Sequence, residues 1–282
     1  MGPGFRNLPY LLRRTIVASF DDGLFTIAKG AAYSSLLSFF PVLTTATTIF
    51  VQTRADYVQA VIAEFLHEVL PPGTEQVVLE QFRLSGKRPA ALLVVALFLA
   101  IWAAASVIKS LIDGFNAAYR VPQTRSILAH NGVGLMLVFF AAVPLLGASS
   151  LILFGGAIER YVLELFQIDP ALKPLSKTWE FVSHLLRYAV ALLATATLNT
   201  ILYYYGPFRK QRWVAVWPGA ILATVLWLAV TGGFAWYVRN ITNYNVLYGS
   251  VGSSIALLVW MYLLSAIALV GCEFNAEIER FR

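Results

Sequence analysis

The stretch "AALLVVALFLAIWAAASVI", residues 90–108, contains no charged side chain and shows no alternation between apolar and polar positions. Its length is close to the roughly 20 apolar residues that an α-helix needs to cross the hydrocarbon core of a bilayer. A transmembrane β-strand would be about 10 residues long and would alternate in polarity. The stretch therefore predicts a transmembrane helix, which pairs its own backbone donors and acceptors inside the lipid.

Similar apolar stretches recur along the chain. Together they predict six spans, at about residues 31–51, 89–108, 133–154, 185–205, 214–238 and 246–270. The composition agrees, because 59% of the 282 residues are hydrophobic and 13% are charged, whereas a soluble domain has about 25% charged residues. The expected fold class is all-α: a polytopic membrane protein with six transmembrane helices in a single membrane domain, residues 1–282.

The basic residues indicate an orientation. The short loop "GPFRKQRW" (206–213) is dense in Arg and Lys, whereas the loop "RNITNYN" (239–245) contains only Arg239. Basic residues in short loops favour the cytoplasmic side, so we expect both termini in the cytoplasm. The net charge of +6 is then explained by topology, and we expect no nucleic acid partner.

The longest predicted connection, residues 52–88, joins the first two spans and would lie outside the cytoplasm. It contains an amphipathic segment, residues 55–70, which Pro71 ends. We therefore expect an extracytoplasmic helical cap. Both a fixed cap and a moving lid fit this pattern.

The residue types that usually carry catalysis are sparse. Cys272 is the single cysteine, which excludes a disulfide within the chain and a cysteine metal cluster. His67, His130 and His184 have no spacing typical of metal ligands. No nucleophile, base and orienting group can be assembled from the pattern. We expect no catalytic residue, no metal, no cofactor and no enzymatic activity.

The first and fourth predicted spans carry polar side chains that lipid does not favour. In "KGAAYSSLLSFFPVLTTATTIF" (29–50) they recur three and four residues apart on one helix face, and the fourth span has a row at a spacing of four. The candidate groove or substrate residues are Ser34, Ser38, Pro41, Thr45, Thr48, Arg187, Thr195 and Asn199.

Two explanations of these rows stay open. Small and hydroxyl residues let membrane helices pack closely, and the hydroxyls bond to another helix or to their own backbone. Pro41 would then only bend its helix. Alternatively, the rows line a hydrated groove inside the bundle. Arg187 would either extend its charge to the interface or bind an anionic lipid head group.

A further polar row follows the second span. Lys109, Asp113, Asn116 and Arg120 are spaced four, three and four residues apart, and Glu273 and Glu277 fall at the same predicted membrane level. We expect Arg120 to pair with Glu273 or Glu277, as a structural clasp or as a gate. The candidate cytoplasmic clasp comprises Lys109, Asp113, Asn116, Tyr119, Arg120, Glu273, Asn275 and Glu277.

Three stretches resemble the YihY/BrkB family: "KGAAYSSLLSFFPVL", "LIDGFNAAYRV" and "YGSVGSSIALLVWMYLLSAIALVGCEFNAEIE". The resemblance covers roughly residues 15–279 and implies a multi-pass protein of the bacterial cytoplasmic (inner) membrane. The family has been tied to serum resistance, a virulence-related trait, and by inference to lipid handling in the envelope. It also carries an old "ribonuclease BN" label, which these residues do not support.

The resemblance and the polar rows lead to the same expectation. The protein would move or handle a lipid or amphiphile through a polar groove in the helix bundle. A non-transporting scaffold for an envelope complex is the alternative, and a membrane-embedded hydrolase is disfavoured because no catalytic set is present. The expected partners are membrane lipids, anionic ones among them, and either a second copy of the chain or an envelope-complex protein.

Overall fold

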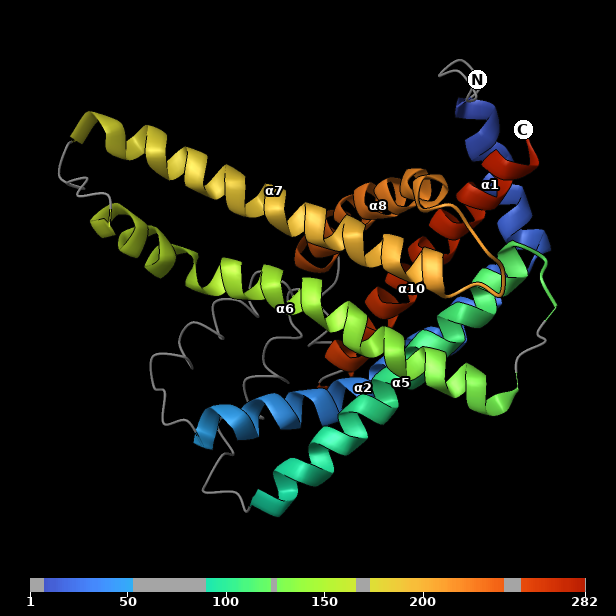
Figure 1. The fold of residues 1–282 in the computed structure, drawn as a ribbon, viewed down its shortest axis with the longest axis horizontal. Helices are drawn as coiled ribbons and strands as arrows, with labels where there is room; N and C mark the ends of the chain where they lie inside the picture. Colours follow the sequence, from blue (N-terminus) through green and yellow to red (C-terminus); the bar gives the residue numbers. More distant parts are fainter. Residues whose placement is uncertain (1–7, 53–89, 123–125, 166–172, 241–249, 282) are drawn as a thin grey trace.

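The computed structural model describes residues 8–52, 90–122, 126–165, 173–240 and 250–281, and this part of the chain is all-α (Figure 1). Its helices are α1 (Leu8–Asp21), α2 (Leu24–Gln52), α5 (Ala90–Ala118), α6 (Ile127–Leu165), α7 (Lys173–Tyr205), α8 (Trp213–Asn240) and α10 (Ser250–Arg280). The predicted all-α fold is confirmed. The predicted outer cap, apart from its first residue, lies outside the described residues.

Four of the helices in the described part of the chain are long and apolar enough to cross a membrane. These segments are Leu93–Ala118, Ile127–Gly147, Trp213–Tyr237 and Ser254–Arg280. They correspond to the second, third, fifth and sixth predicted spans. The first and fourth predicted spans lie within α2 and α7, and the count of six spans stays a prediction.

The helices pack in pairs around α10. Helix α2 runs along α5, α10 packs against both α2 and α8, and α6 and α7 form a hairpin joined to the rest through α5 and α8. In Figure 1 the α2–α5 pair and the α6–α7 pair diverge toward their far ends. Helix α1 lies at the opposite end, together with the ends of α5 and α10. We call this opposite end, including the loop 206–212, the charged end.

The main core lies toward the charged end and combines small residues with large apolar ones such as Phe115 and Tyr203. Ala28 and Ala31 of α2, Ala118 of α5, Ala220 of α8 and Cys272 of α10 are all buried in it. Elsewhere, large apolar side chains are exposed, such as Phe98 of α5, Val143 of α6 and Leu193 of α7. Apolar exposure on this scale is unfavourable in water and is what lipid-facing helices require.

Glycine permits the closest crossing, between α8 and α10. A Cβ atom on Gly219 would collide with the carbonyl oxygen of Gly271, and one on Gly271 would lie 2.8 Å from the carbonyl oxygen of Gly219. Small residues allow membrane helices to approach to backbone contact, which increases their van der Waals attraction. The α8–α10 pair is therefore in backbone contact at this crossing.

The corner between α1 and α2 also depends on glycine. Gly23 has a φ of 68°, a left-handed conformation that glycine adopts without steric cost. Its carbonyl accepts hydrogen bonds from the amides of Thr26 (3.0 Å) and Ile27 (3.2 Å), so α2 begins there. Helix α2 then continues through Pro41.

Candidate functional site

Three helices meet in a network of charges at the charged end. The network contains three guanidinium groups and three carboxylates, so its formal charges balance. They come from α1, the α1–α2 corner, the end of α5 and the last turns of α10. We call this network the clasp, and its members are Arg14, Asp22, Arg120, Glu273, Glu277 and Arg280.

Arg280 is the centre of the clasp. Its Nη1 donates to Glu273 Oε1 at 2.8 Å and also to Glu277 Oε1. Its Nη2 donates to the carbonyl oxygen of Ala118 at the end of α5 and lies 3.8 Å from Asp22 Oδ2. A single side chain thus joins the end of α10 to α5 and to the α1–α2 corner.

The two glutamates are buried where they meet these cations. Glu273 is 0% exposed and Glu277 is 2% exposed. Glu277 Oε2 forms an ion pair with Nε of Arg14. The two groups are not aligned as a hydrogen bond. Glu273 Oε2 has no hydrogen-bond partner among the described residues. A buried carboxylate that loses its cation is strongly destabilising, so the clasp is energetically sensitive to each of its members.

Arg120 ends α5 in an unusual conformation. Its φ is 54°, and its amide donates to the carbonyl of Ala117 while the Val121 amide donates to that of Asn116, both at 2.9 Å. This is the Schellman pattern, in which the left-handed position is usually glycine. A residue with a side chain is strained there by about 1–2 kcal/mol.

The side chain of Arg120 corrects one prediction. Its Nε donates to Asp22 at 3.1 Å and 3.3 Å from the two carboxylate oxygens. The predicted pairing with Glu273 or Glu277 is therefore wrong, because Arg280 and Arg14 occupy those carboxylates. The chain turns into the left-handed conformation at Arg120, so this residue no longer continues the helical row that the spacing assumed. Asp22, Arg14 and Arg280 were not singled out from the sequence.

Two buried asparagines tie the same end to α8 and to the loop before it. Asn275 Oδ1 accepts from the amide of Gly219 at 2.7 Å, and its Nδ2 donates to the carbonyl of Val216 at 2.9 Å. Asn116 Oδ1 accepts from the amide of Phe208 at 2.8 Å. Its Nδ2 has no partner among the described residues. Both were predicted at this end, and the structure gives them partners outside the clasp.

The remaining predicted clasp residues face other neighbours. Lys109 Nζ donates to Asn131 Oδ1 at 3.0 Å, and Asp113 Oδ1 lies 3.7 Å from His130 Nε2, so both connect α5 to α6. Tyr119 lies under the guanidinium of Arg209, 4.6 Å from its ring centroid. Burial raises the pKa of the Tyr119 phenol, which therefore stays neutral.

Three hydroxyls of the candidate groove are satisfied within their own helices. Ser38 donates to the Ser35 carbonyl at 2.8 Å, Thr45 to the Pro41 carbonyl at 2.9 Å, and Thr195 to the Ala191 carbonyl at 2.9 Å. Ser34 and Pro41 are partly buried. The side chains of Thr48 and Arg187 lie outside the described residues.

Asn199 is the groove candidate whose partner lies on another helix. Its Nδ2 lies 3.4 Å from Thr224 Oγ1, which joins α7 to α8. The row on α2 lies on a helix that packs on α5 and α10, whereas the row on α7 lies on a helix that packs on α6 and α8. A groove shared by the two rows stays a prediction.

A model of the family described as Virulence factor BrkB matches residues 16–282. The chain belongs to the BrkB family. The match contains five of the six clasp residues, and Arg14 precedes it. The sequence resemblance is thus confirmed.

Relatives with similar sequences carry two kinds of name. The ribonuclease-like protein YfkH of Bacillus subtilis is 28% identical over 88% of this chain and 88% of its own length. A UPF0761 membrane protein of Alkalilimnicola ehrlichii is 30% identical over 92% of this chain, which spans 56% of that relative. The UPF0761 membrane protein PSHAa0171 of Pseudoalteromonas translucida is 25% identical over 99% of this chain and 89% of its own length. No solved structure matches.

These names and the apolar helices agree that the BrkB-family chain is a membrane protein. The described residues contain no group of three or more His, Cys, Asp and Glu side chains that could hold a metal ion. The polar chemistry at the charged end consists of ion pairs and amide hydrogen bonds between helices. Such an arrangement can hold helices together and can release them when its ion pairs break.

Proposed function

We propose that this BrkB-family protein moves or handles a lipid or another amphiphile in the bacterial inner membrane, with the clasp as its closed cytoplasmic gate. One observation carries the proposal. Buried ion pairs hold α1, α5 and α10 together at the charged end, while the α2–α5 and α6–α7 pairs diverge at the other end (Figure 1).

The clasp has the properties of a two-state element. Its cations are shared, because Arg280 contacts Glu273, Glu277 and the Ala118 carbonyl. Losing one contact leaves buried charge uncompensated, so the network favours being fully formed or fully broken. Opening and closing of a membrane protein require discrete states of this kind.

The divergent pairs support an amphiphile as the substrate. On α2, the partly buried Ser34 and Ser38 lie near Leu37 and Phe40, which are exposed. A lipid needs apolar surface for its chains and weakly polar surface for its head group. The Ser38 hydroxyl donates to the Ser35 carbonyl and can still accept a further hydrogen bond from a passing head group.

The basic loops support the orientation of this proposal. Arg209, Lys210 and Arg212 lie in the loop 206–212 at the charged end. Basic residues in short loops stay on the cytoplasmic side. The clasp and both termini are therefore assigned to the cytoplasm, and the divergent ends to the outer side.

A scaffold is the second candidate, and a different observation favours it. The hydroxyls of Ser38, Thr45 and Thr195 are satisfied within their own helices, and Gly219 and Gly271 bring α8 and α10 into backbone contact. A bundle of this kind can be rigid, with a function limited to holding partners at its outer loops.

Reconstitution with a fluorescent lipid separates the two functions. The purified full chain is placed in liposomes whose inner leaflet contains a dithionite-quenchable head-group label, and the loss of the protected fluorescence is followed. Transport predicts that wild-type protein exposes the label faster than protein-free liposomes do. Glu273→Gln removes one ion-pair partner from the closed gate with little change in shape, so it raises this rate, whereas Arg212→Gln at an exposed loop position keeps it.

The outcome is decided by two comparisons. A wild-type rate equal to that of protein-free liposomes rejects transport and favours the scaffold. A wild-type rate that exceeds the protein-free rate, with Glu273→Gln unchanged, keeps lipid movement and rejects the clasp as its gate. Mass spectrometry of the lipids that copurify with each variant identifies the head group that the protein retains.

A further inference from the structure

Helix α1 has two faces of different chemistry. One face packs on α10 and is buried through Leu11, Thr15, Ala18 and Ser19. Leu11 contacts a small cluster that contains Phe274 and Ile278 of α10. The helix is therefore held to the bundle by its small and apolar side, at the charged end.

The buried hydroxyls of α1 need no partner from another helix. Thr15 Oγ1 donates to the Leu11 carbonyl at 2.8 Å, and Ser19 Oγ donates to the Thr15 carbonyl at 2.7 Å. The inward face of α1 therefore has its polar groups hydrogen-bonded and its side chains buried. The side chains of α1 that are not covered by another helix lie on its outward face.

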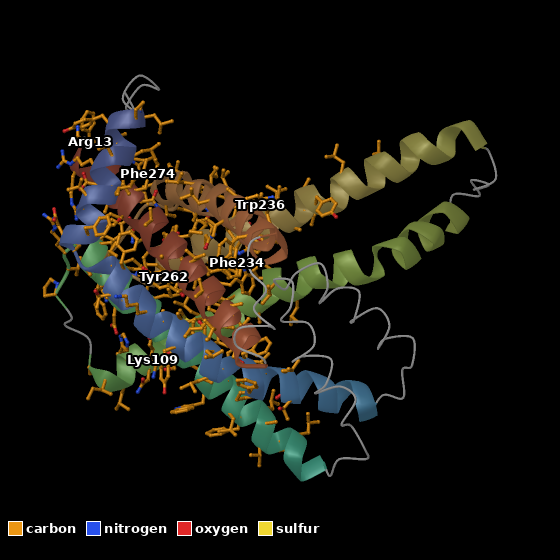
Figure 2. The ribbon with its side chains drawn as sticks, turned by 180° about the vertical axis from the view of Figure 1, so that it is seen from behind. Arg13, Lys109, Phe234, Trp236, Tyr262 and Phe274 are labelled. Carbon is orange, nitrogen blue, oxygen red and sulfur yellow. The ribbon has the colours of Figure 1, made fainter. Side chains whose placement is uncertain are left out.

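The outward face is apolar around one cation. Tyr10, Ile16, Val17 and Phe20 are each more than half exposed, and Arg13 is exposed among them. The positions 10, 13, 17 and 20 are three or four residues apart, so they form one stripe on the helix. Figure 2 shows Arg13 at the outer edge of α1, with Phe274 on the side toward α10.

Neighbouring aromatic residues extend this stripe. The ring of Tyr10 lies 6.0 Å from that of Phe281 at the end of α10, and the ring of Phe20 lies 4.6 Å from that of Phe25 in α2. Phe281 is also exposed. The apolar surface therefore continues from α1 onto the two helices that it joins.

We infer that the outward face of α1 lies in the head-group region of the cytoplasmic leaflet, with its apolar side chains at the acyl boundary and Arg13 among anionic phosphates. Helix α1 turns away from α2 at the Gly23 corner (Figure 1), so it need not cross the bilayer. An apolar stripe with basic residues is the composition of helices that lie in the membrane interface.

Charge favours the anionic lipid surface over the other occupants. The exposed charged residues of α1 are Arg13, Arg14 and Asp21, and Arg14 is engaged by Glu277. With the exposed Lys29 of α2, the remaining charges have a net value of +1, and Arg13 is the cation within the apolar stripe. A second copy of this chain would bring Arg13 near another Arg13 across a twofold interface, which is repulsive. Anionic head groups attract such cations within a Debye length of the surface.

The test uses spin labels at single introduced cysteines in the full chain, reconstituted into phosphatidylcholine vesicles with phosphatidylglycerol. Native Cys272 is buried, and wild type treated with the same spin-label reagent controls for its reaction. Val17→Cys probes the outward face of α1. Val143→Cys on exposed α6 and Lys210→Cys in the exposed loop give the lipid and water references.

The proposal expects the label at position 17 to collide with lipid-soluble oxygen more than with a water-soluble nickel complex, as at position 143. Adding Arg13→Glu lowers this preference by at least about fivefold in the anionic vesicles, because the loss of one basic residue near the surface alone has about that effect and the new carboxylate is also repelled. Arg13→Lys retains the preference. In phosphatidylcholine alone, Arg13→Glu has little effect.

Three results overturn the proposal. Water-like accessibility at position 17, equal to that at position 210, means that the face is free or awaits a soluble protein. Dipolar broadening between labels at position 17 means that a second copy covers it. Lipid-like accessibility that is unchanged by Arg13→Glu removes the role of anionic head groups. None of these measurements depends on lipid transport, so they are independent of the proposed function.

Discussion

Polar residues are satisfied in two different ways in this protein. Along the α2 and α7 rows, Ser38, Thr45 and Thr195 bond to carbonyls of their own helices. In the clasp, Arg280 bonds to α5 as well as to α10, and Arg14 and Arg120 bridge other elements. A hydroxyl can find a backbone acceptor within one turn, whereas buried charges need opposite charges that the same helix does not supply in sufficient number. These three hydroxyls therefore do not link one helix to another, although Asn199 of the α7 row joins α7 to α8 through Thr224. The ion pairs of the clasp fix how the helices are arranged at the charged end.

Removing the central cation of the clasp should have the largest effect. Arg280→Gln leaves Glu273 and Glu277 buried without their shared partner, which costs about 3–5 kcal/mol when a buried pair is broken. We expect a clear drop in the thermal unfolding midpoint in detergent. Arg212→Gln, at an exposed position, should change stability by no more than about 0.5 kcal/mol. Equal midpoints for the two variants would show that the clasp contributes no stability.

The glycine crossing should give the next largest effect. Gly219→Ala places a methyl group against the Gly271 carbonyl, and overpacking of this kind costs about 1–3 kcal/mol. Gly232→Ala is the matched control on the same helix, because a Cβ there meets nothing within 4 Å. It should be neutral or stabilise the protein by up to about 1 kcal/mol. In side-by-side measurements, the unfolding midpoint of Gly219→Ala should fall, and that of Gly232→Ala should stay at the wild-type value or rise.

Arg120 should show a smaller effect with a diagnostic order. Arg120→Ala loses the exposed pair with Asp22, worth about 0–1 kcal/mol, and keeps the strain of φ 54°. Arg120→Gly loses the same pair and relieves the strain, so it should be more stable than Arg120→Ala by about 1 kcal/mol. If alanine proves the better residue in thermal unfolding, the left-handed end of α5 is incorrect.

The rows should give the smallest effect on stability. Thr45→Val and Thr195→Val remove hydroxyls that bond within their own helices, and hydrogen bonds in membrane proteins average about 0.6 kcal/mol. We expect midpoints within that range of wild type. If the rows also form a lipid path, the same variants slow lipid movement in the liposome measurement. Destabilisation comparable to that of Arg280→Gln would place these hydroxyls in contacts between helices.

Several features of the clasp could be predicted and others could not. The sequence places Glu273, Glu277 and Arg120 at one membrane level, and the structure brings all of them to the charged end. The predicted pairing of Arg120 with these glutamates was wrong because Arg120 leaves the helical conformation. Its actual partner, Asp22, lies nearly a hundred residues away in the chain, so helical spacing could not indicate it. The sequence signal for this corner was Gly23 after Asp22, since a left-handed glycine marks a helix end.

The sequence by itself determined that this is an all-α membrane protein of the BrkB family, because lipid imposes long apolar helices that any reader of the chain can recognise. The tertiary structure alone decided which cation serves which carboxylate, which hydroxyls stay within their own helix, and that α8 meets α10 through Gly219 and Gly271. The physical reason is the distance in sequence over which each property is set. Apolar length and helical spacing are local properties, whereas ion pairs and backbone contacts depend on how distant segments cross, which no local pattern specifies.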